Sequence, residues 1–212
     1  NSSTWTELNI LETLRKRNPL IICITNDVVR TFTANGLLAI GASPVMSECS
    51  EDLEDLIVHA SALLINIGTV TPDKVTYYKE AITLAKAHEV PIVLDPVGCH
   101  AGAYRLSVVL DLIKTDAISL LRGNQSEIKA IYDALNTNHK IDRSLSGKGV
   151  DGEQVEDSAI ITYRLARLIN CPVVATGEED YVSDGTRVFA VPHGHPIMTA
   201  VTGTGCLLGA VL

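Results

Sequence analysis

The chain has 212 residues, of which 46% are hydrophobic and 20% are charged, and its formal net charge is −8. This length fits one large domain with a sizeable core, so we expect residues 1–212 to form a single domain. The composition is ordinary for a soluble globular protein, and the acidic balance offers no basic stripe for nucleic acid.

The length of the apolar stretches and the cysteine content indicate the cellular location of the protein. No stretch approaches the length of a membrane span, so we expect no membrane partner. The five cysteines include no C-x-x-C pair and are odd in number. This usage argues against a disulfide framework and against a structural zinc site, and it favours a reducing, cytoplasmic location.

The first fifth of the chain alternates helix and strand signals. Leucines at helical spacing predict a helix over residues 3–17, and the apolar run 20–24 after Pro19 predicts a buried strand. Asn26 and Asp27 follow that strand, and one of them is expected to cap the next helix while the other remains open for ligand contact. That helix, residues 28–40, is apolar on more than one face and is expected to be well buried.

Two further strand and helix units follow. Residues 41–46 turn into a short extended piece that ends at Met46, a residue type that more often fills a core than lines a ligand site. An acidic start predicts a helix from residue 50 onward. A strand is expected at 62–67, followed by a helix from Thr71 to about residue 88.

Two later strands end on side chains with functional potential. Residues 90–94 form a buried apolar run that ends on Asp95, and residues 117–121 predict a strand that leads to Arg122. Asn124 and Glu127, three positions apart, have the spacing of a helix capping box. That local role would by itself explain the glutamate.

The last third continues the alternation. Residues 144–152 are glycine-rich and are expected to form a surface loop, followed by a helix at 158–169 and a strand at 172–175 that ends on Thr176. Residues 181–188 predict a hairpin around Asp184 and Gly185. His193 and His195 lie two apart in a loop, which is not a helical metal-ligand spacing and disfavours zinc.

Residues 201–212 join a glycine-rich turn to an apolar helical run. Gly203 and Gly205 keep side chains away from the backbone, and the first turn of the helix offers its N–H groups to a phosphate or an oxyanion. Cys206 lies at the positive end of that helix, so we expect the pKa of its thiol to be lowered. The alternative is a simple strand-to-helix turn with a small cysteine packed beneath it.

Repeated strand and helix units with continuously apolar strands predict an α/β fold with a predominantly parallel sheet and helices on both faces. In such folds ligands bind beyond the carboxyl ends of the strands. That edge collects a carboxylate for a hard cation, a guanidinium for phosphate, and a backbone anion pocket, which are the parts of phosphoryl transfer. The residues expected there are Asn26, Asn66, Asp95, Arg122, Thr176 and the turn at Gly203.

Several sequence blocks, in order along nearly the whole chain, resemble the hydroxyethylthiazole kinase family. They include Asn66-Ile67-Gly68-Thr69, Asp95-Pro96-Val97-Gly98, Arg122-Gly123-Asn124, Thr176-Gly177-Glu178 and Val201-Thr202-Gly203-Thr204-Gly205-Cys206. The resemblance implies a ribokinase-like fold and a homotrimer with sites between subunits. It also implies Mg²⁺-dependent transfer of the γ-phosphoryl group of ATP to 4-methyl-5-(2-hydroxyethyl)thiazole in thiamine salvage.

The same resemblance implies a role for each matching residue. The substrate side comprises Met46, Gly203 and Asn26, the ATP contacts are Arg122 and Thr176, and the magnesium residues are Asp95 and Glu127. Cys206 matches the position that faces the substrate hydroxyl, which is usually aspartate in the wider superfamily. The chain departs from the family at Cys99-His100-Ala101-Gly102, where small residues are usual, and it lacks the family's C-terminal helices.

Two other functions are compatible with parts of this pattern. Cys206 could be a covalent nucleophile with His193 or His195 as its base, but Asp95, Arg122 and Glu127 would then have no role. A sensor that binds thiazole or nucleotide without turnover would use the same pocket.

Overall fold

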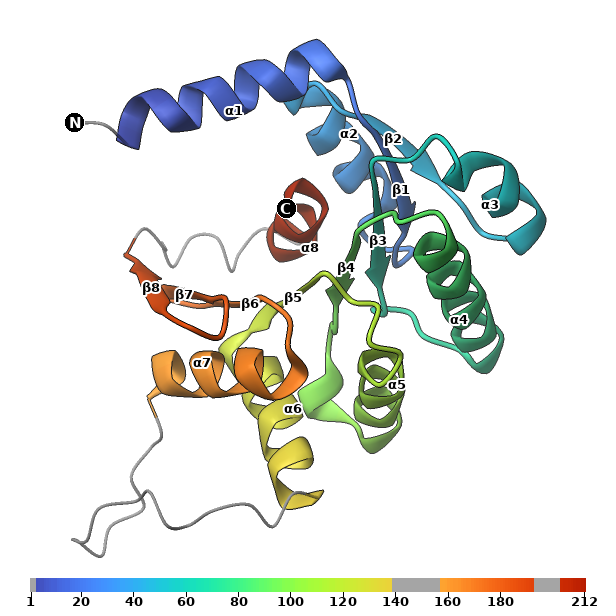
Figure 1. The fold of residues 1–212 in the computed structure, drawn as a ribbon. Helices are drawn as coiled ribbons and strands as arrows, with labels where there is room; N and C mark the ends of the chain where they lie inside the picture. The colour runs from blue at the N-terminus through green and yellow to red at the C-terminus, as the bar shows by residue number, and fades with distance from the viewer. Residues whose placement is uncertain (1–2, 139–156, 193–202) are drawn as a thin grey trace, which may run out of the picture.

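The computed structural model describes residues 3–138, 157–192 and 203–212, so the predicted loop at 144–152 and the two histidines at 193 and 195 lie outside the described residues. An eight-stranded sheet crosses the molecule in the order β2-β1-β3-β4-β5-β6-β7-β8 (Figure 1). The strands are β1 (Leu20–Ile24), β2 (Ser43–Met46), β3 (Ala62–Asn66), β4 (Ile92–Asp95), β5 (Leu120–Asn124), β6 (Val173–Thr176), β7 (Asp180–Ser183) and β8 (Val188–Val191).

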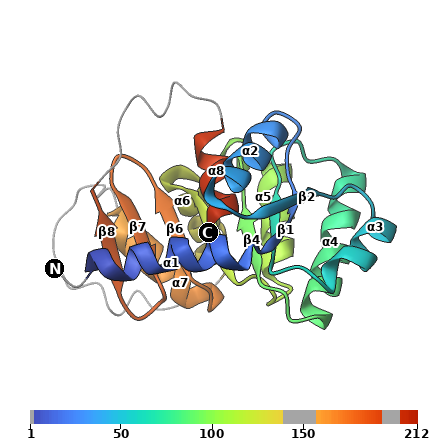
Figure 2. The ribbon, with the colours of Figure 1, turned by 90° about the horizontal axis from the view of Figure 1, so that it is seen from above.

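Helices cover both faces of the sheet. They are α1 (Ser3–Arg17), α2 (Arg30–Ile40), α3 (Ser50–Ile57), α4 (Pro72–Ala87), α5 (Ala103–Ile113), α6 (Gln125–Asn138), α7 (Ser158–Ile169) and α8 (Thr204–Val211), with a 3-10 turn η1 (Cys99–Ala101). Helices α1, α2 and α8 lie on one face of the sheet, and α4 to α7 lie on the other (Figures 1 and 2). Helix α8 contacts β3, β4 and β5, so it lies over the middle of the sheet.

The pairing of the strands confirms the predicted parallel sheet. Strands β2, β1, β3, β4, β5 and β6 are all parallel, whereas β7 and β8 add an antiparallel edge. The predicted hairpin is present, because β7 and β8 pair in antiparallel fashion. In the turn between them, Asp184 Oδ1 accepts hydrogen bonds from the backbone N–H groups of Thr186 at 2.9 Å and Arg187 at 3.0 Å. The carboxyl ends of the parallel strands therefore meet at one edge.

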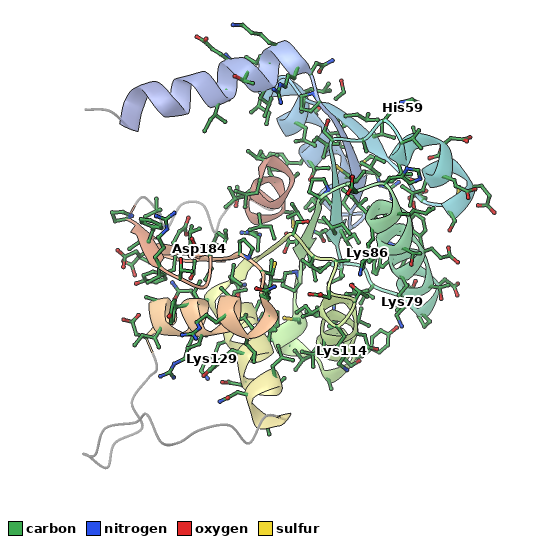
Figure 3. The ribbon with its side chains drawn as sticks, viewed as in Figure 1. His59, Lys79, Lys86, Lys114, Lys129 and Asp184 are labelled. Carbon is green, nitrogen blue, oxygen red and sulfur yellow. The ribbon has the colours of Figure 1, made fainter. Side chains whose placement is uncertain are left out.

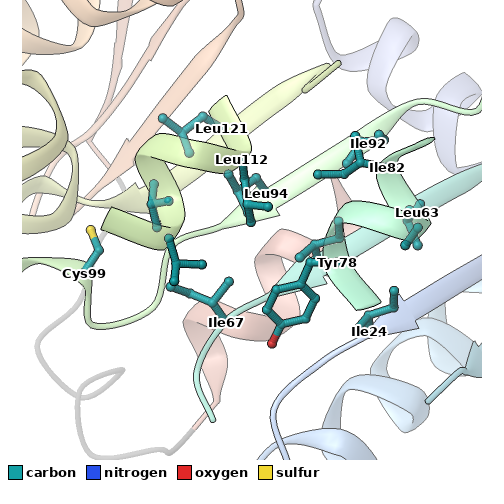
Figure 4. Close-up of a cluster of buried hydrophobic side chains, with 14 of the residues drawn as sticks. Ile24, Leu63, Ile67, Tyr78, Ile82, Ile92, Leu94, Cys99, Leu112 and Leu121 are labelled. Carbon is teal, nitrogen blue, oxygen red and sulfur yellow. The ribbon is translucent and has the colours of Figure 1, made fainter. Parts of the chain in front are cut away.

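The main hydrophobic core lies between the sheet and helices α3 to α7. Its strand residues include Leu63, Ile92 and Leu94, and these pack with helix side chains such as Tyr78 and Leu112 (Figure 4). Burying each such side chain stabilises the fold by about 1.5–3 kcal/mol. A smaller apolar cluster joins the sheet to α2 and α8, and it consists of Cys23, Leu37, Ala42, Leu64, Val93 and Ala210.

Helix α2 is less buried than its sequence suggests. It begins at Arg30 rather than at residue 28, and its buried residues are Thr33 and Leu37. Phe32 and Leu38 remain 39% and 59% exposed. The prediction of a well-buried helix was wrong because α2 packs against β2, α8 and α1 and leaves its remaining surface exposed.

Two elements near the centre of the chain also differ from expectation. No element was expected between residues 98 and 117, where the structure has η1 and α5. Strand β5 begins three residues later than predicted and continues through Asn124. Arg122 and Gly123 extend the strand because they pair in register with Val174 and Ala175 of β6, and this pairing overrides weak local strand propensity.

The surface carries dispersed charges. Exposed lysines occupy separate places, with Lys79 and Lys86 on α4, Lys114 after α5 and Lys129 on α6 (Figure 3). Among the described residues, no helix combines the length and the apolar character that crossing a membrane requires.

Candidate active site

The site begins at the loop that follows β1. Asn26 is buried, its Oδ1 accepts the backbone N–H of Val28 at 3.1 Å, and its Nδ2 donates to Asn66 Oδ1 at 2.9 Å. The N-cap of α2 is Val29, with no side-chain cap hydrogen bond. The prediction that Asn26 or Asp27 caps this helix was therefore wrong. Asn26 instead closes a local Asx turn, and that turn directs its amide toward the sheet.

The next link joins β3 to β4. Asn66 and Asp95 are the last residues of these strands, they are register partners, and both are 0% exposed. Asn66 Nδ2 donates to Asp95 Oδ2 at 3.3 Å, and Asn66 Oδ1 also accepts the backbone N–H of Gly68 at 3.0 Å. The amide of Asn66 thus connects the loop after β1 with the carboxylate after β4.

The chain of contacts continues across β5 to β6. Arg122 Nη1 lies 3.3 Å from Asp95 Oδ2, and Arg122 Nη2 donates to Thr176 Oγ1 at 2.9 Å. The Thr176 hydroxyl donates in turn to the carbonyl of Gly123 at 3.4 Å. The predicted gathering of polar side chains at one sheet edge is confirmed, and it forms one continuous network.

Asp95 is a fully buried carboxylate whose pKa is strongly shifted by its surroundings. Its Oδ1 is buried and makes no hydrogen bond within the described part of the chain, and the same holds for Arg122 Nε. Burial raises the pKa of Asp95 to about 7, an effect that Arg122 opposes and Glu127 reinforces. Because the unpartnered Oδ1 belongs to a carboxylate at the carboxyl ends of the parallel strands, where ligands bind in such folds, it is available to a ligand.

A divalent cation fits this carboxylate. Mg²⁺ prefers oxygen ligands, keeps several waters and is typically held by one or two carboxylates together with substrate phosphates. The bare Oδ1 of Asp95 supplies such an oxygen. The described residues contain no group of three or more His, Cys, Asp or Glu side chains suited to a metal.

Helix α8 places an anion-binding turn against Arg122. The helix follows Gly203, whose φ of 91° and whose close contact with Val29 leave no room for a side chain. A methyl group added at Gly205 would lie 2.9 Å from Arg122 Nη2. The guanidinium therefore lies directly beside the positive N-terminal turn of the helix, and together these groups favour an anion such as phosphate.

Cys206 faces the network from the first turn of α8. It is half-buried, and Asn26 Nδ2 donates to its sulfur at 3.7 Å. The pKa of the thiol is raised above its ordinary value, first by burial and then by Asp95, while Asn66, Asn26 and Arg122 oppose the shift. The expected lowering of this pKa was wrong, because desolvation of the thiolate outweighs the favourable helix end and the polar neighbours.

Glu127 holds two backbone segments together. Its Oε2 accepts the N–H of Asn124 and the Asn124 Oδ1 accepts the N–H of Glu127, both at 2.8 Å, so the predicted capping box is present. Its Oε1 accepts the N–H of Gly98 at 2.8 Å, which lies in the loop after β4. Both carboxylate oxygens therefore have structural partners, and a magnesium role for Glu127 stays a prediction.

We expect Glu127→Gln to lower the free energy of unfolding by about 1–3 kcal/mol, the cost of leaving a buried donor without its acceptor. The glutamine NH₂ group must face the N–H of either Gly98 or Asn124, because each now contacts a carboxylate oxygen. Urea unfolding measures the loss, with the exposed Asp133→Asn on the same helix as control. Equal stability of the glutamine variant and the control would contradict this dual role.

Met46 and Gln125 are two further residues near this edge. Met46 is the half-buried last residue of β2 and packs with the smaller apolar cluster, so its contact with substrate stays a prediction. Gln125 was not expected at this edge, and its Nε2 donates to the carbonyl of Glu179 at 2.9 Å while its Oε1 accepts the hydroxyl of Ser158 at 2.9 Å. A polar residue at the first position of a helix was the available signal. A hollow of about 560 Å³ is lined by Gln125, Glu178, Glu179, Tyr181 and Pro192.

Comparison with known proteins identifies relatives of the whole chain. The sequence model of the hydroxyethylthiazole kinase family matches residues 11–212. A hydroxyethylthiazole kinase of Streptococcus agalactiae is 53% identical over 95% of this chain and 75% of its own length. The Streptococcus suis enzyme of the same name is 50% identical over 95% of this chain and 74% of its own.

Solved structures agree with the sequence relatives. A hydroxyethylthiazole kinase protein from Pyrococcus horikoshii superposes with a TM-score of 0.83 at 40% identity, covering 94% of this chain and 72% of that one. A ribokinase-like superfamily protein from Enterococcus faecalis superposes with a TM-score of 0.60 at 12% identity, covering 91% and 68% of the two chains. The second likeness establishes the fold alone, which is ribokinase-like.

Proposed function

The chain belongs to the hydroxyethylthiazole kinase family, and we propose that it transfers the γ-phosphoryl group of ATP to the hydroxyl of 4-methyl-5-(2-hydroxyethyl)thiazole in thiamine salvage. The observation that carries this proposal is the contact between the Arg122 guanidinium and the first turn of α8. This contact brings cationic and N–H donors together at the edge that also holds the Asp95 carboxylate. Phosphoryl transfer depends mainly on such positioning and charge stabilisation.

The reaction requires one proton transfer. The hydroxyl oxygen of the thiazole alcohol forms a bond to the γ-phosphorus, the bond from that phosphorus to the bridging oxygen of ADP breaks, and ADP leaves with that electron pair. The hydroxyl proton passes to the sulfur of Cys206 in its thiolate form. Asn26 supports this role, because its Nδ2 donates to that sulfur. The N–H groups at the start of α8 and Arg122 stabilise the charge of the transferring group.

The same edge divides into a substrate side and an ATP side. Asn26, Met46 and Gly203 form the substrate side, and Arg122 and Thr176, which are joined by a hydrogen bond, bind ATP. Asp95 and Glu127 would hold Mg²⁺, which supplies charge neutralisation on the phosphates when bound. We further propose a homotrimer with sites between subunits. The free state of all five cysteines is consistent with a cytoplasmic location.

Arg122→Lys is expected to raise the Michaelis constant for ATP by roughly 10- to 100-fold, the equivalent of one lost charge-assisted hydrogen bond of about 1.5–3 kcal/mol. A point ammonium cannot hold Asp95, Thr176 and a phosphate oxygen at once, as the planar guanidinium can. Steady-state kinetics with varied ATP measures the effect, and Arg167→Lys on the exposed face of α7 serves as control. The same Michaelis constant for both variants would remove Arg122 from the ATP site.

One assay separates the proposed kinase from the two alternatives. The protein is incubated with thiazole alcohol, ATP and Mg²⁺, with and without chelator, and both ADP and phosphorylated alcohol are quantified. The proposal predicts equal amounts of the two products, and it predicts that chelator abolishes both. Binding without either product would indicate a sensor. A stoichiometric covalent adduct on Cys206 would indicate a nucleophilic enzyme, for which His193 or His195, both outside the described residues, would be the base.

A further inference from the structure

Asn66 occupies the centre of the network although no role has been assigned to it. It is 0% exposed and makes hydrogen bonds to three different segments, namely Asn26, Gly68 and Asp95. We propose that Asn66 is a positioning residue of the phosphoryl transfer, which aims the amide of Asn26 at the Cys206 sulfur and binds one oxygen of Asp95 while the other stays open to ligand. This inference rests on the proposed kinase function.

The direction of each hydrogen bond follows from two backbone groups. The N–H of Gly68 can only donate, so the atom of Asn66 that faces it, and that also faces Asn26, is the acceptor Oδ1. The N–H of Val28 likewise requires that Asn26 presents its Oδ1 to the backbone. Asn26 therefore presents its NH₂ group to Asn66. The two amides have one consistent orientation, fixed at both ends by the main chain.

This orientation determines what the reacting groups receive. The Nδ2 of Asn26 carries two hydrogens, one of which goes to Asn66 Oδ1 and leaves the other for the Cys206 sulfur at 3.7 Å. The sulfur is therefore held as a hydrogen-bond acceptor, which favours the thiolate. On the opposite side, Asn66 Nδ2 binds Asp95 Oδ2 and leaves Oδ1 without a partner among the described residues.

Close packing keeps the Asn26 amide in place. A methyl group added at Gly68 would lie 2.7 Å from both Cβ and Nδ2 of Asn26, so the chain after β3 presses directly against this side chain. Asn26 and Asn66 are both buried, so bulk water does not compete for their hydrogen bonds. Without Asn66, the Nδ2 of Asn26 loses its nearest acceptor, and only the turn contact with the N–H of Val28 still holds this amide beside the Cys206 sulfur.

Asn66→Ser separates positioning from a purely structural role. A serine hydroxyl at this position can still accept the N–H of Gly68 in an ST turn, but it is too short to bridge Asn26 and Asp95. Asn66→Ala removes the turn contact as well. Thr33→Val is the matched control, because Thr33 is 0% exposed and its hydroxyl makes no hydrogen bond within the described residues.

Two readouts test the proposal. We expect Asn66→Ser to fold with a lowered melting temperature, because the buried Nδ2 of Asn26 loses its acceptor. We also expect it to lower kcat by on the order of 10²-fold with both Michaelis constants nearly unchanged, as misplacement of reacting groups does. Without substrate, iodoacetamide should alkylate Cys206 about 2- to 10-fold more slowly than in the wild type, the effect of one hydrogen bond to the thiolate. Asn66 and the Asn26 amide that it holds both favour the thiolate of Cys206. Peptide mass spectrometry gives this rate, with the exposed Cys49 as internal reference.

Two kinds of result would overturn the positioning role, and a third would overturn the kinase proposal alone. A folded serine variant with wild-type kcat, or with an unchanged ratio of Cys206 to Cys49 alkylation, would overturn the positioning role. Failure of both the serine and alanine variants to fold would also overturn it, because Asn66 would then be a structural residue. If the wild type itself forms no phosphorylated alcohol, the kinase proposal fails, while the substrate-free alkylation ratio still tests the link between Asn66 and Cys206.

Discussion

Replacing Asp95 with alanine is expected to abolish turnover and to lower the free energy of unfolding by about 3–5 kcal/mol, the usual cost of breaking a buried ion pair. The variant leaves the Arg122 guanidinium, which is only 6% exposed, without its carboxylate partner. It also leaves Asn66 Nδ2 without an acceptor and removes the oxygen that suits a cation. Urea unfolding and steady-state kinetics measure the two losses.

A second variant separates the two effects. Asp95→Ala combined with Arg122→Met replaces the ion pair by apolar groups, and such replacements are often neutral for stability. The double variant should therefore recover much of the unfolding free energy, while turnover stays absent. Asp95→Ala with wild-type turnover would remove this carboxylate from the site, and a single variant as stable as the wild type would show that the ion pair with Arg122 is unimportant.

Cys206→Ala is expected to lower kcat by up to roughly 10²–10⁴-fold, the range of general-base catalysis, with both Michaelis constants nearly unchanged. The sulfur accepts a hydrogen bond from Asn26 and lies on the first turn of α8, where it can receive the hydroxyl proton. The remaining activity reflects Arg122 and the helix N-terminus, which stay in place. An alanine variant with unaltered kcat would mean that the sulfur only packs.

Cys206→Asp provides the matching test, because an aspartate can accept the same proton. The pKa of the Cys206 thiol lies above its ordinary value, so the thiolate fraction of the wild type grows as pH rises through the neutral and alkaline range. The kcat of the wild type should rise with pH over that range. In the aspartate variant, kcat should be at least that of the wild type at neutral pH and should depend less on pH. If the variant instead loses several kcal/mol of stability through burial of the carboxylate, packing is the main role of this position.

Much of the fold could be predicted because its signals are local and repeated. Continuously apolar strands such as residues 20–24 and 90–94 indicate a parallel sheet, and parallel strands place their carboxyl ends at one edge. This geometry explains why Asp95, Arg122 and Thr176 were expected together and do form one network. The capping box of Glu127 was equally local, since Asn124 lies three positions before it.

The features that escaped prediction depend on contacts distant in sequence. The pKa of Cys206 follows from how deeply α8 packs against the sheet, which no local pattern reveals. The second acceptor role of Glu127 needs Gly98, and the bridging role of Asn66 needs the pairing of β3 with β4. The partial burial of α2 likewise arises from its neighbours β2, α8 and α1.

The most direct test of the account follows the phosphorus atom itself. Phosphorus NMR is recorded while the protein, thiazole alcohol, ATP and Mg²⁺ react, and the transferred group is identified through its coupling to the neighbouring CH₂ protons. The account predicts that the γ-phosphate signal of ATP is replaced by a monoester signal coupled to those protons, and that Asp95→Ala produces none. Inorganic phosphate alone, or a monoester formed equally by Asp95→Ala, would contradict it.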